Sequence, residues 1–340
     1  MRTFLTRDVL NRSAGVPGRP AAVLAVLMSL AVMAAGCSRS TAQAPATRPS
    51  AATVAATAPA ISPATWPATS AAAASAPARY PSDELAAACQ KVQKDVAGKL
   101  DAGFNTVLEP PFVIAGNLSQ KDLAAFTRSC VTIPAELMWK SYFRAKPDKV
   151  ITVLLFKDEA SYRDWAKKLF GDAEVSHFGY YKPDKRTLVM NIGTGGGTLI
   201  HELTHALIVY DFPEVPQWFN EGLASLHEGC RMGEGEIIGL TNWRLKGLKQ
   251  VIEAGKLRPL SEMLSKDDFY GELKGINYAQ SRYLFQYIQS KGLLKKFYDQ
   301  FRSTHDQPDA AVKAVEHVLG KKIDQVEADY LKYVGTLKYP

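Results

Sequence analysis

The sequence predicts an α+β fold, in which a small lobe built on a mixed β-sheet precedes a mostly helical lobe. A continuous apolar, β-branched run at residues 150–156 is typical of a buried strand. Two shorter strand-like runs, 178–181 and 187–192, flank a turn that contains Pro183. From residue 241 onward every element that the pattern predicts is a helix. Strands gathered in one part of the chain and helices in another favour the α+β class.

The elements before and after these strands follow from capping and turn residues. Ser82 is followed by two acidic residues and begins a helix that should run to about residue 100. A short strand is expected at residues 111–115, and a helix at 119–143 with an interruption near Pro134. Gly171 should end a helix over residues 158–170. The helical part is expected at the following ranges: 243–255, 261–267, 276–290, 292–303, 309–319 and 322–337.

Residues 1–37 have the pattern of an export signal. Arginines begin the segment, and a run of 15 uncharged, apolar residues follows from Ala21 to Ala35. This run is shorter than the roughly 20 residues that a membrane span needs. Small residues directly before Cys37 resemble a bacterial lipobox, in which Cys37 would become the lipidated first residue of a cell-envelope lipoprotein. The alternatives are an ordinary signal peptide that is cleaved nearby and an uncleaved anchor.

Residues 38–81 should form a tether. They are mainly Ala, Pro, Thr and Ser with almost no charge, so they cannot bury enough apolar surface to offset the entropy lost on ordering. The folded domain is then expected over residues 82–340. We divide it into an α/β lobe (82–197), a pair of helices that carries the candidate site (198–230) and a helical lobe (231–340).

The sequence His201-Glu202-Leu203-Thr204-His205 has the spacing of a metal site on a helix. Histidines four residues apart lie on one helix face, so both imidazoles can reach a single Zn²⁺. Glu202 can then face the open coordination position and accept a proton from a water molecule there.

Glu221 is the predicted third ligand. His205 lies five residues before the expected end of its helix at Tyr210, and Glu221 lies five residues after the next helix begins at Pro216. At about 1.5 Å per residue, each lies about 7.5 Å from the turn, so the two side chains come level if the helices are antiparallel. Glu228, seven residues further on, returns to nearly the same face and could accept a hydrogen bond from the second ring nitrogen of a ligand histidine.

These residues resemble the gluzincin clan of zinc metallopeptidases, the peptidase MA-like families. The resemblance rests on H-E-L-T-H-A-L followed by P-Q-W-F-N-E-G-L-A. It implies a zincin-like fold, zinc bound by His201, His205 and Glu221, and Glu202 as the general base. It also implies that the strand at 187–192 lines the cleft and pairs with an extended peptide. A tyrosine of the helical lobe, with Tyr278 as first choice, would stabilise the oxyanion.

The expected function is therefore a zinc-dependent peptidase that acts on peptides or proteins and is held at the bacterial envelope by its lipid. Two alternatives stay open: a non-catalytic envelope factor that keeps a peptidase fold for binding, and a hydrolase of cell-wall peptides. The net charge of +7 is spread along the chain, so nucleic acid is not an expected partner. Export makes a disulfide between Cys89 and Cys130 plausible. The sequence does not specify the oligomeric state.

Overall fold

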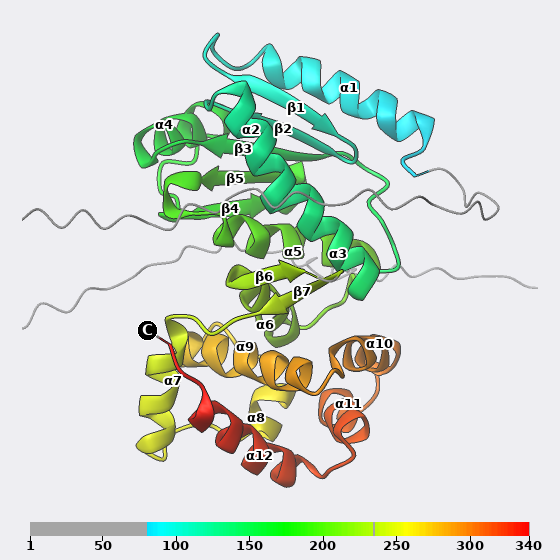
Figure 1. Ribbon diagram of the computed structural model, residues 1–340, viewed down its shortest axis with the longest axis vertical. Helices are drawn as coiled ribbons and strands as arrows, with labels where there is room; N and C mark the ends of the chain where they lie inside the picture. The colour runs from blue at the N-terminus through cyan, green and yellow to red at the C-terminus, as the bar shows by residue number, and fades with distance from the viewer. Residues whose placement is uncertain (1–79, 234, 340) are drawn as a thin grey trace, which may run out of the picture.

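The computed structural model describes residues 80–233 and 235–339, which form two lobes with a pair of helices between them (Figure 1). The sheet lobe (residues 80–196) lies at one end, and the helical lobe (residues 240–339) at the other. The predicted export segment, Cys37 and the tether up to residue 79 lie outside the described residues. Tyr80 already belongs to the folded part, since its hydroxyl donates to the Pro147 carbonyl at 3.0 Å. None of the described helices has both the length and the apolar character that crossing a membrane requires.

A five-stranded mixed sheet forms the centre of the sheet lobe, in the order β1-β2-β3-β5-β4. Its inner pairs are parallel and its outer pairs are antiparallel. The predicted strand at 150–156 is β3, and it is buried on both faces because it is hydrogen-bonded to β2 and β5 and covered by helices. The strand bounds are β1 Asn105–Glu109, β2 Phe112–Gly116, β3 Ile151–Phe156, β4 Gly179–Lys182 and β5 Thr187–Asn191.

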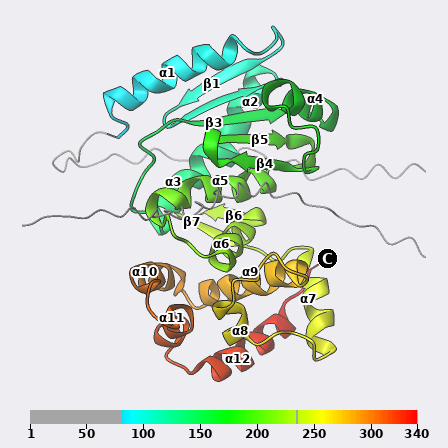
Figure 2. The same ribbon diagram turned by 180° about the vertical axis from the view of Figure 1, so that it is seen from behind.

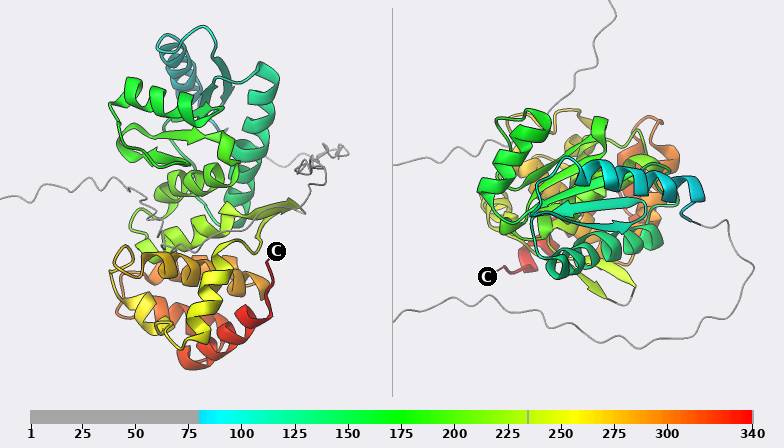
Figure 3. Two further views of the ribbon diagram at one scale, coloured as in Figure 1. Left: turned by 90° about the vertical axis from the view of Figure 1, so that its left-hand side faces the viewer. Right: turned by 90° about the horizontal axis from the view of Figure 1, so that it is seen from above.

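Helices cover both faces of this sheet (Figures 2 and 3). One face packs against α1 (Asp83–Ala97) and α4 (Glu159–Phe170). The other packs against α2 (Gln120–Thr127), α3 (Ile133–Ser141) and α5. The expected interruption near Pro134 is a π-helical turn that separates α2 from α3. The predicted helix ends are confirmed at Ser82, which caps α1, and at Gly171, which ends α4 with φ +75°, while Asp158 is the N-cap of α4.

The two helices that carry the candidate site are α5 (Gly197–Asp211) and α6 (Gln217–Glu228), and they pack side by side. Helix α5 begins at Gly197, with Gly196 as its N-cap residue. A Cβ atom on Gly197 would lie 2.3 Å from the Glu228 carbonyl oxygen, so the start of α5 closes directly on the end of α6. This contact shows that the helices are antiparallel, as predicted.

The segment after α6 is a second, two-stranded sheet, which is not among the strands that the sequence predicts. Strands β6 (Cys230–Gly233) and β7 (Glu236–Gly239) form an antiparallel hairpin. Side chains of the helical lobe bind the outer edge of β7: Gln289 accepts from Gly239 N at 2.8 Å and donates to the Ile237 carbonyl at 3.0 Å. Residues distant in the sequence stabilise this short hairpin. The local pattern of residues 230–239 alone therefore does not indicate strands.

All six predicted helices of the helical lobe are confirmed, and α9 at its centre packs closely on α6. The aromatic rings of Trp218 and Phe219 on α6 contact Phe285 on α9 and Phe297 and Phe301 on α10. This cluster fixes α6, and with it Glu221, against the helical lobe. The helices are α7 Arg244–Glu253, α8 Leu260–Ser265, α9 Lys274–Ser290, α10 Leu294–Thr304, α11 Ala310–Leu319 and α12 Ile323–Thr336.

Gly222 marks the closest approach of α6 to α9. A Cβ atom there would lie 2.2 Å from Ser281 Oγ and 2.8 Å from the Phe285 ring. We expect Gly222→Ala to lower the free energy of unfolding by about 1–3 kcal/mol because it overpacks this contact. Gly247→Ala is the matched control: Gly247 is on α7 with open space around it, so alanine should stabilise the protein by roughly 0.5–1 kcal/mol. Urea denaturation measures both, and equal effects would contradict the tight α6–α9 contact.

The predicted disulfide between Cys89 and Cys130 is wrong. Both thiols are free, as is that of Cys230. Cys89 is buried under α1 on one face of the sheet. Cys130 lies in the π-helical turn on the opposite face, against Gly196. The sheet separates the two side chains, which the spacing in the sequence could not reveal.

Candidate metal centre

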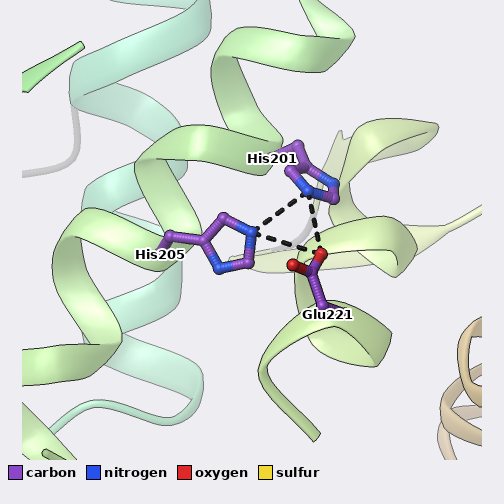
Figure 4. Close-up of side chains that lie close together, drawn as sticks. All are labelled: His201, His205 and Glu221. Carbon is purple, nitrogen blue, oxygen red and sulfur yellow. Dashed lines mark hydrogen bonds and ion pairs between the residues drawn. The ribbon is translucent and has the colours of Figure 1, made fainter. Parts of the chain in front are cut away.

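Three side chains from α5 and α6 converge on a common point, as the sequence predicted (Figure 4). His201 Nε2 and His205 Nε2 lie 3.1 Å apart. Glu221 Oε2 lies 3.3 Å from the first of these nitrogens and 3.4 Å from the second. His201 is 6% exposed and Glu221 4% exposed, so the cluster is largely shielded from water.

These separations fit a metal ion. Bonds of about 2.0–2.1 Å in a tetrahedral site place neighbouring ligand atoms about 3.3–3.4 Å apart. Glu221 Oε2 is buried and makes no hydrogen bond within the described part of the chain, although it faces both imidazoles. An unsatisfied buried carboxylate oxygen is costly, and a cation between the three atoms would satisfy it. The cluster can therefore hold a metal ion.

The histidines and the glutamate of the cluster shift one another's pKa values. Burial opposes protonation of His205, but the carboxylates of Glu221 and Glu202 and the hydrogen bond with Asn220 together raise its pKa to about 9. Burial also opposes ionisation of Glu221, but the facing imidazoles of His205 and His201 hold its pKa well below the usual range. The site thus stabilises a carboxylate facing positive charge, which is the electrostatic arrangement that suits a cation.

Asn220 orients one of the histidines. Its Oδ1 lies 2.7 Å from His205 Nδ1, so the amide oxygen accepts from the protonated ring nitrogen and leaves Nε2 free to bind a metal. His201 Nδ1, in contrast, is buried and has no hydrogen-bond partner among residues 80–233 and 235–339. The sequence analysis missed Asn220, although it directly precedes Glu221 and its type is suited to the task.

The prediction that Glu228 contacts a ligand histidine is wrong. Glu228 instead forms an ion pair with Arg244 at the start of α7. The prediction used only the angle of Glu228 around α6. It did not consider how far along the neighbouring helix α5 this residue lies. The end of α6 is level with Gly197, one helical turn before His201, so the carboxylate of Glu228 lies beyond the imidazole that it was expected to contact.

Glu202 follows the first histidine on α5 and lies beside the cluster. Burial raises its pKa, and the nearby carboxylates of Glu221 and Glu228 act in the same direction, whereas His201 and His205 oppose the shift. The charge of Glu202 is therefore coupled to the charges of the two histidines and the two other glutamates. A carboxyl group with a raised pKa next to a metal site is suited to accepting and returning a proton.

Tyr270 of the helical lobe contacts Glu221, and Tyr278 lies near it, packed against Phe269. The hydroxyl of Tyr270 donates to Glu221 Oε1 at 2.5 Å, which leaves Oε2 to face the histidines. Tyr278 is 4% exposed, and burial together with Glu221 and Tyr270 raises its pKa, so its hydroxyl keeps its proton. The structure brings the predicted Tyr278 to the centre. It also adds Tyr270, which lies between α8 and α9 where the sequence showed no periodic pattern.

The strand expected to pair with a substrate is not free. Both edges of β5 are occupied, by β3 and by β4. The edge strand on this side of the sheet is β4, which packs against α5. The hydroxyl of Ser176 already donates to the Gly179 carbonyl at 2.7 Å and accepts from Gly179 N at 3.2 Å. The first residue of β4 therefore has no main-chain group left for a peptide.

No family model matches the chain, and no curated protein matches it. The description of the centre therefore rests on its geometry. Two imidazoles and a carboxylate converge, one amide and one tyrosine orient them, and Glu202 lies alongside.

Proposed function

We propose that the protein is a zinc-dependent peptidase. The observation that carries the proposal is the spacing of His201 Nε2, His205 Nε2 and Glu221 Oε2, which lie 3.1–3.4 Å from one another in a buried site. Two nitrogens and one oxygen at tetrahedral spacing are the donor set that zinc favours, whereas calcium and magnesium favour oxygen alone. Three protein ligands rather than four are typical of a catalytic zinc site.

The residues around the centre have separate tasks in this proposal. A bound zinc ion would supply Lewis acidity toward a substrate carbonyl and toward a water molecule. Glu202 accepts the proton of the attacking water and passes it to the leaving amine. The hydroxyl of Tyr278 donates to the oxygen on which negative charge develops. Tyr270 and Asn220 hold Glu221 and His205 in place.

Peptide hydrolysis is favoured over other hydrolytic reactions by the resemblance of the two helices to the gluzincin pair. The paired arrangement that this resemblance implies, with the third ligand on an antiparallel second helix, has the geometry described above. The export pattern in residues 1–37 and Cys37 supports a place at the cell envelope. We accordingly propose a lipid-tethered peptidase whose substrates are peptides or unfolded proteins.

Metal analysis of the full-length protein tests the centre. We expect close to one zinc per chain, and loss of nearly all of it in His201→Ala and in Glu221→Ala, since each removes one of three ligands. His317→Ala is the matched control, because His317 is exposed on α11 and distant in sequence from the cluster. Zinc retained in both ligand variants would contradict the site.

A protease assay tests the activity. The full-length protein should hydrolyse an unfolded protein substrate, and a zinc chelator should stop the reaction until zinc is restored. Bound zinc without hydrolysis of any peptide would remove the peptidase assignment and favour the non-catalytic binding factor. Hydrolysis of purified cell-wall peptides alone would favour the second alternative.

A further inference from the structure

The guanidinium of Arg244 lies between two aromatic rings beside the metal centre. Its Cζ is 4.3 Å from the centroid of the Trp243 ring and 5.6 Å from that of Tyr278. Arg244 is only 7% exposed, and its Nη1 is paired with Glu228 at the end of α6. Cation–π contacts and an ion pair therefore fix this side chain, and with it one face of the Trp243 ring.

Trp243 is the most exposed of the large apolar residues in the described chain, at 61%. Its position relative to the centre follows from Arg244. Because both distances start from Arg244 Cζ, the centroids of the Trp243 and Tyr278 rings lie no more than about 10 Å apart. The ring of Tyr278 packs against that of Phe269, with centroids 5.0 Å apart, and the next residue, Tyr270, donates a hydrogen bond to the ligand Glu221. At about 3.3 Å per residue, the rings of Trp243 and Tyr278 are separated by at most the length of roughly three residues of an extended peptide.

A second exposed apolar side chain accompanies the other tyrosine of the site. Leu273 is 49% exposed, and the adjacent Lys274 places its ammonium 5.5 Å from the Tyr270 ring. Leu273 is three residues along the chain from Tyr270, so the segment that carries this tyrosine also exposes apolar surface.

We propose that Trp243 determines specificity by binding a large apolar side chain, preferably an aromatic one, of the peptide substrate. This inference rests on the proposed peptidase function. The indole offers a large contact area and has only two side-chain torsions. Arg244 holds one of its faces, so little entropy is lost when a ligand orders the ring. Stacking on the free part of the ring removes apolar surface of both partners from water.

Matched peptides test the proposal with the full-length, zinc-loaded protein. One series carries phenylalanine, leucine or alanine in turn at each of the three positions on either side of the cleaved bond. At one position we expect wild-type kcat/KM to be about 10–100-fold higher for phenylalanine than for alanine. Trp243→Ala should reduce this ratio to within about threefold, mainly through KM, and Trp243→Phe should preserve most of it. Zinc content should not change.

Controls separate this inference from the proposed function. Tyr339→Ala removes another exposed aromatic residue, 48% exposed at the C-terminal end, and should leave the ratio unchanged. Peptide binding to Glu202→Gln, measured by calorimetry, reports the same preference without turnover. If no peptide is cleaved but this binding preference exists and is lost in Trp243→Ala, the binding site stands and the peptidase proposal falls. An undiminished preference for phenylalanine in Trp243→Ala, in either assay, overturns the inference.

Discussion

Glu202→Gln should reduce peptide hydrolysis by about 10²–10⁴-fold and leave the bound zinc in place. The expected loss is that of a general base, since glutamine keeps the size of the side chain but cannot accept the proton of the attacking water. Metal binding should persist because Glu202 is not one of the three converging ligands. The substitution should not destabilise the fold, because burial disfavours the charged form of Glu202 and glutamine is neutral.

The measurement combines initial rates of peptide cleavage with metal content of the same samples. Glu214→Gln is the matched control, because this glutamate is 81% exposed in its side chain and pairs only with His305 at the surface, so its replacement should leave the rate unchanged. A Glu202→Gln variant with more than a tenth of wild-type activity would exclude Glu202 as the general base.

Asp211→Ala should lower the free energy of unfolding by about 3–5 kcal/mol, the range for breaking a buried, hydrogen-bonded charge pair. The Asp211 side chain, at the end of α5, is fully buried. It accepts hydrogen bonds from Arg144 N and Ala145 N, at 2.8 and 2.9 Å, and from the Tyr298 hydroxyl at 2.9 Å, and it forms an ion pair with Arg302 Nη1 at 2.9 Å. Alanine would leave these donors without their acceptor.

Thermal unfolding of the full-length protein measures the effect. A loss of 3–5 kcal/mol corresponds to a Tm lower by roughly 10 °C in a domain of this size. Asp211→Asn should fall between alanine and the wild type, since the amide keeps one acceptor oxygen but no charge. A change below about 1 kcal/mol for Asp211→Ala would show that other contacts of α5, α10 and the 144–145 segment hold these elements together without it.

The three residues of the candidate metal site could be predicted from the sequence because a helix converts spacing into direction. His201 and His205 share a face by their separation alone, and antiparallel packing made Glu221 level with them. The residues that orient these ligands were harder to predict. Tyr270 reaches Glu221 from a segment 49 residues further along the chain, and no local pattern encodes such a contact. Asn220 could have been found, since it precedes Glu221 by one residue.

The wrong predictions share a physical cause. Glu228 was placed by its angle around α6, whereas its contact was decided by its height relative to α5. The strand at 187–192 was correctly expected, but its place in the sheet depends on whether β4 pairs with its outer edge. Likewise, the β6–β7 hairpin depends on Gln289 of α9. Strand order and contacts between distant segments are tertiary properties, which periodicity in one sequence does not specify.

Ser176 has a consequence for how this protein avoids associating with itself. An edge strand with free main-chain groups is a template on which a neighbouring molecule can extend the sheet, a common route to aggregation. At Gly179 one hydroxyl takes both groups, so a foreign strand would have to displace an internal hydrogen-bond pair before it could begin to add there. Short length adds to this protection, because β4 has only four residues. Ser176 therefore makes the start of β4 a poor template for sheet extension by a neighbouring molecule.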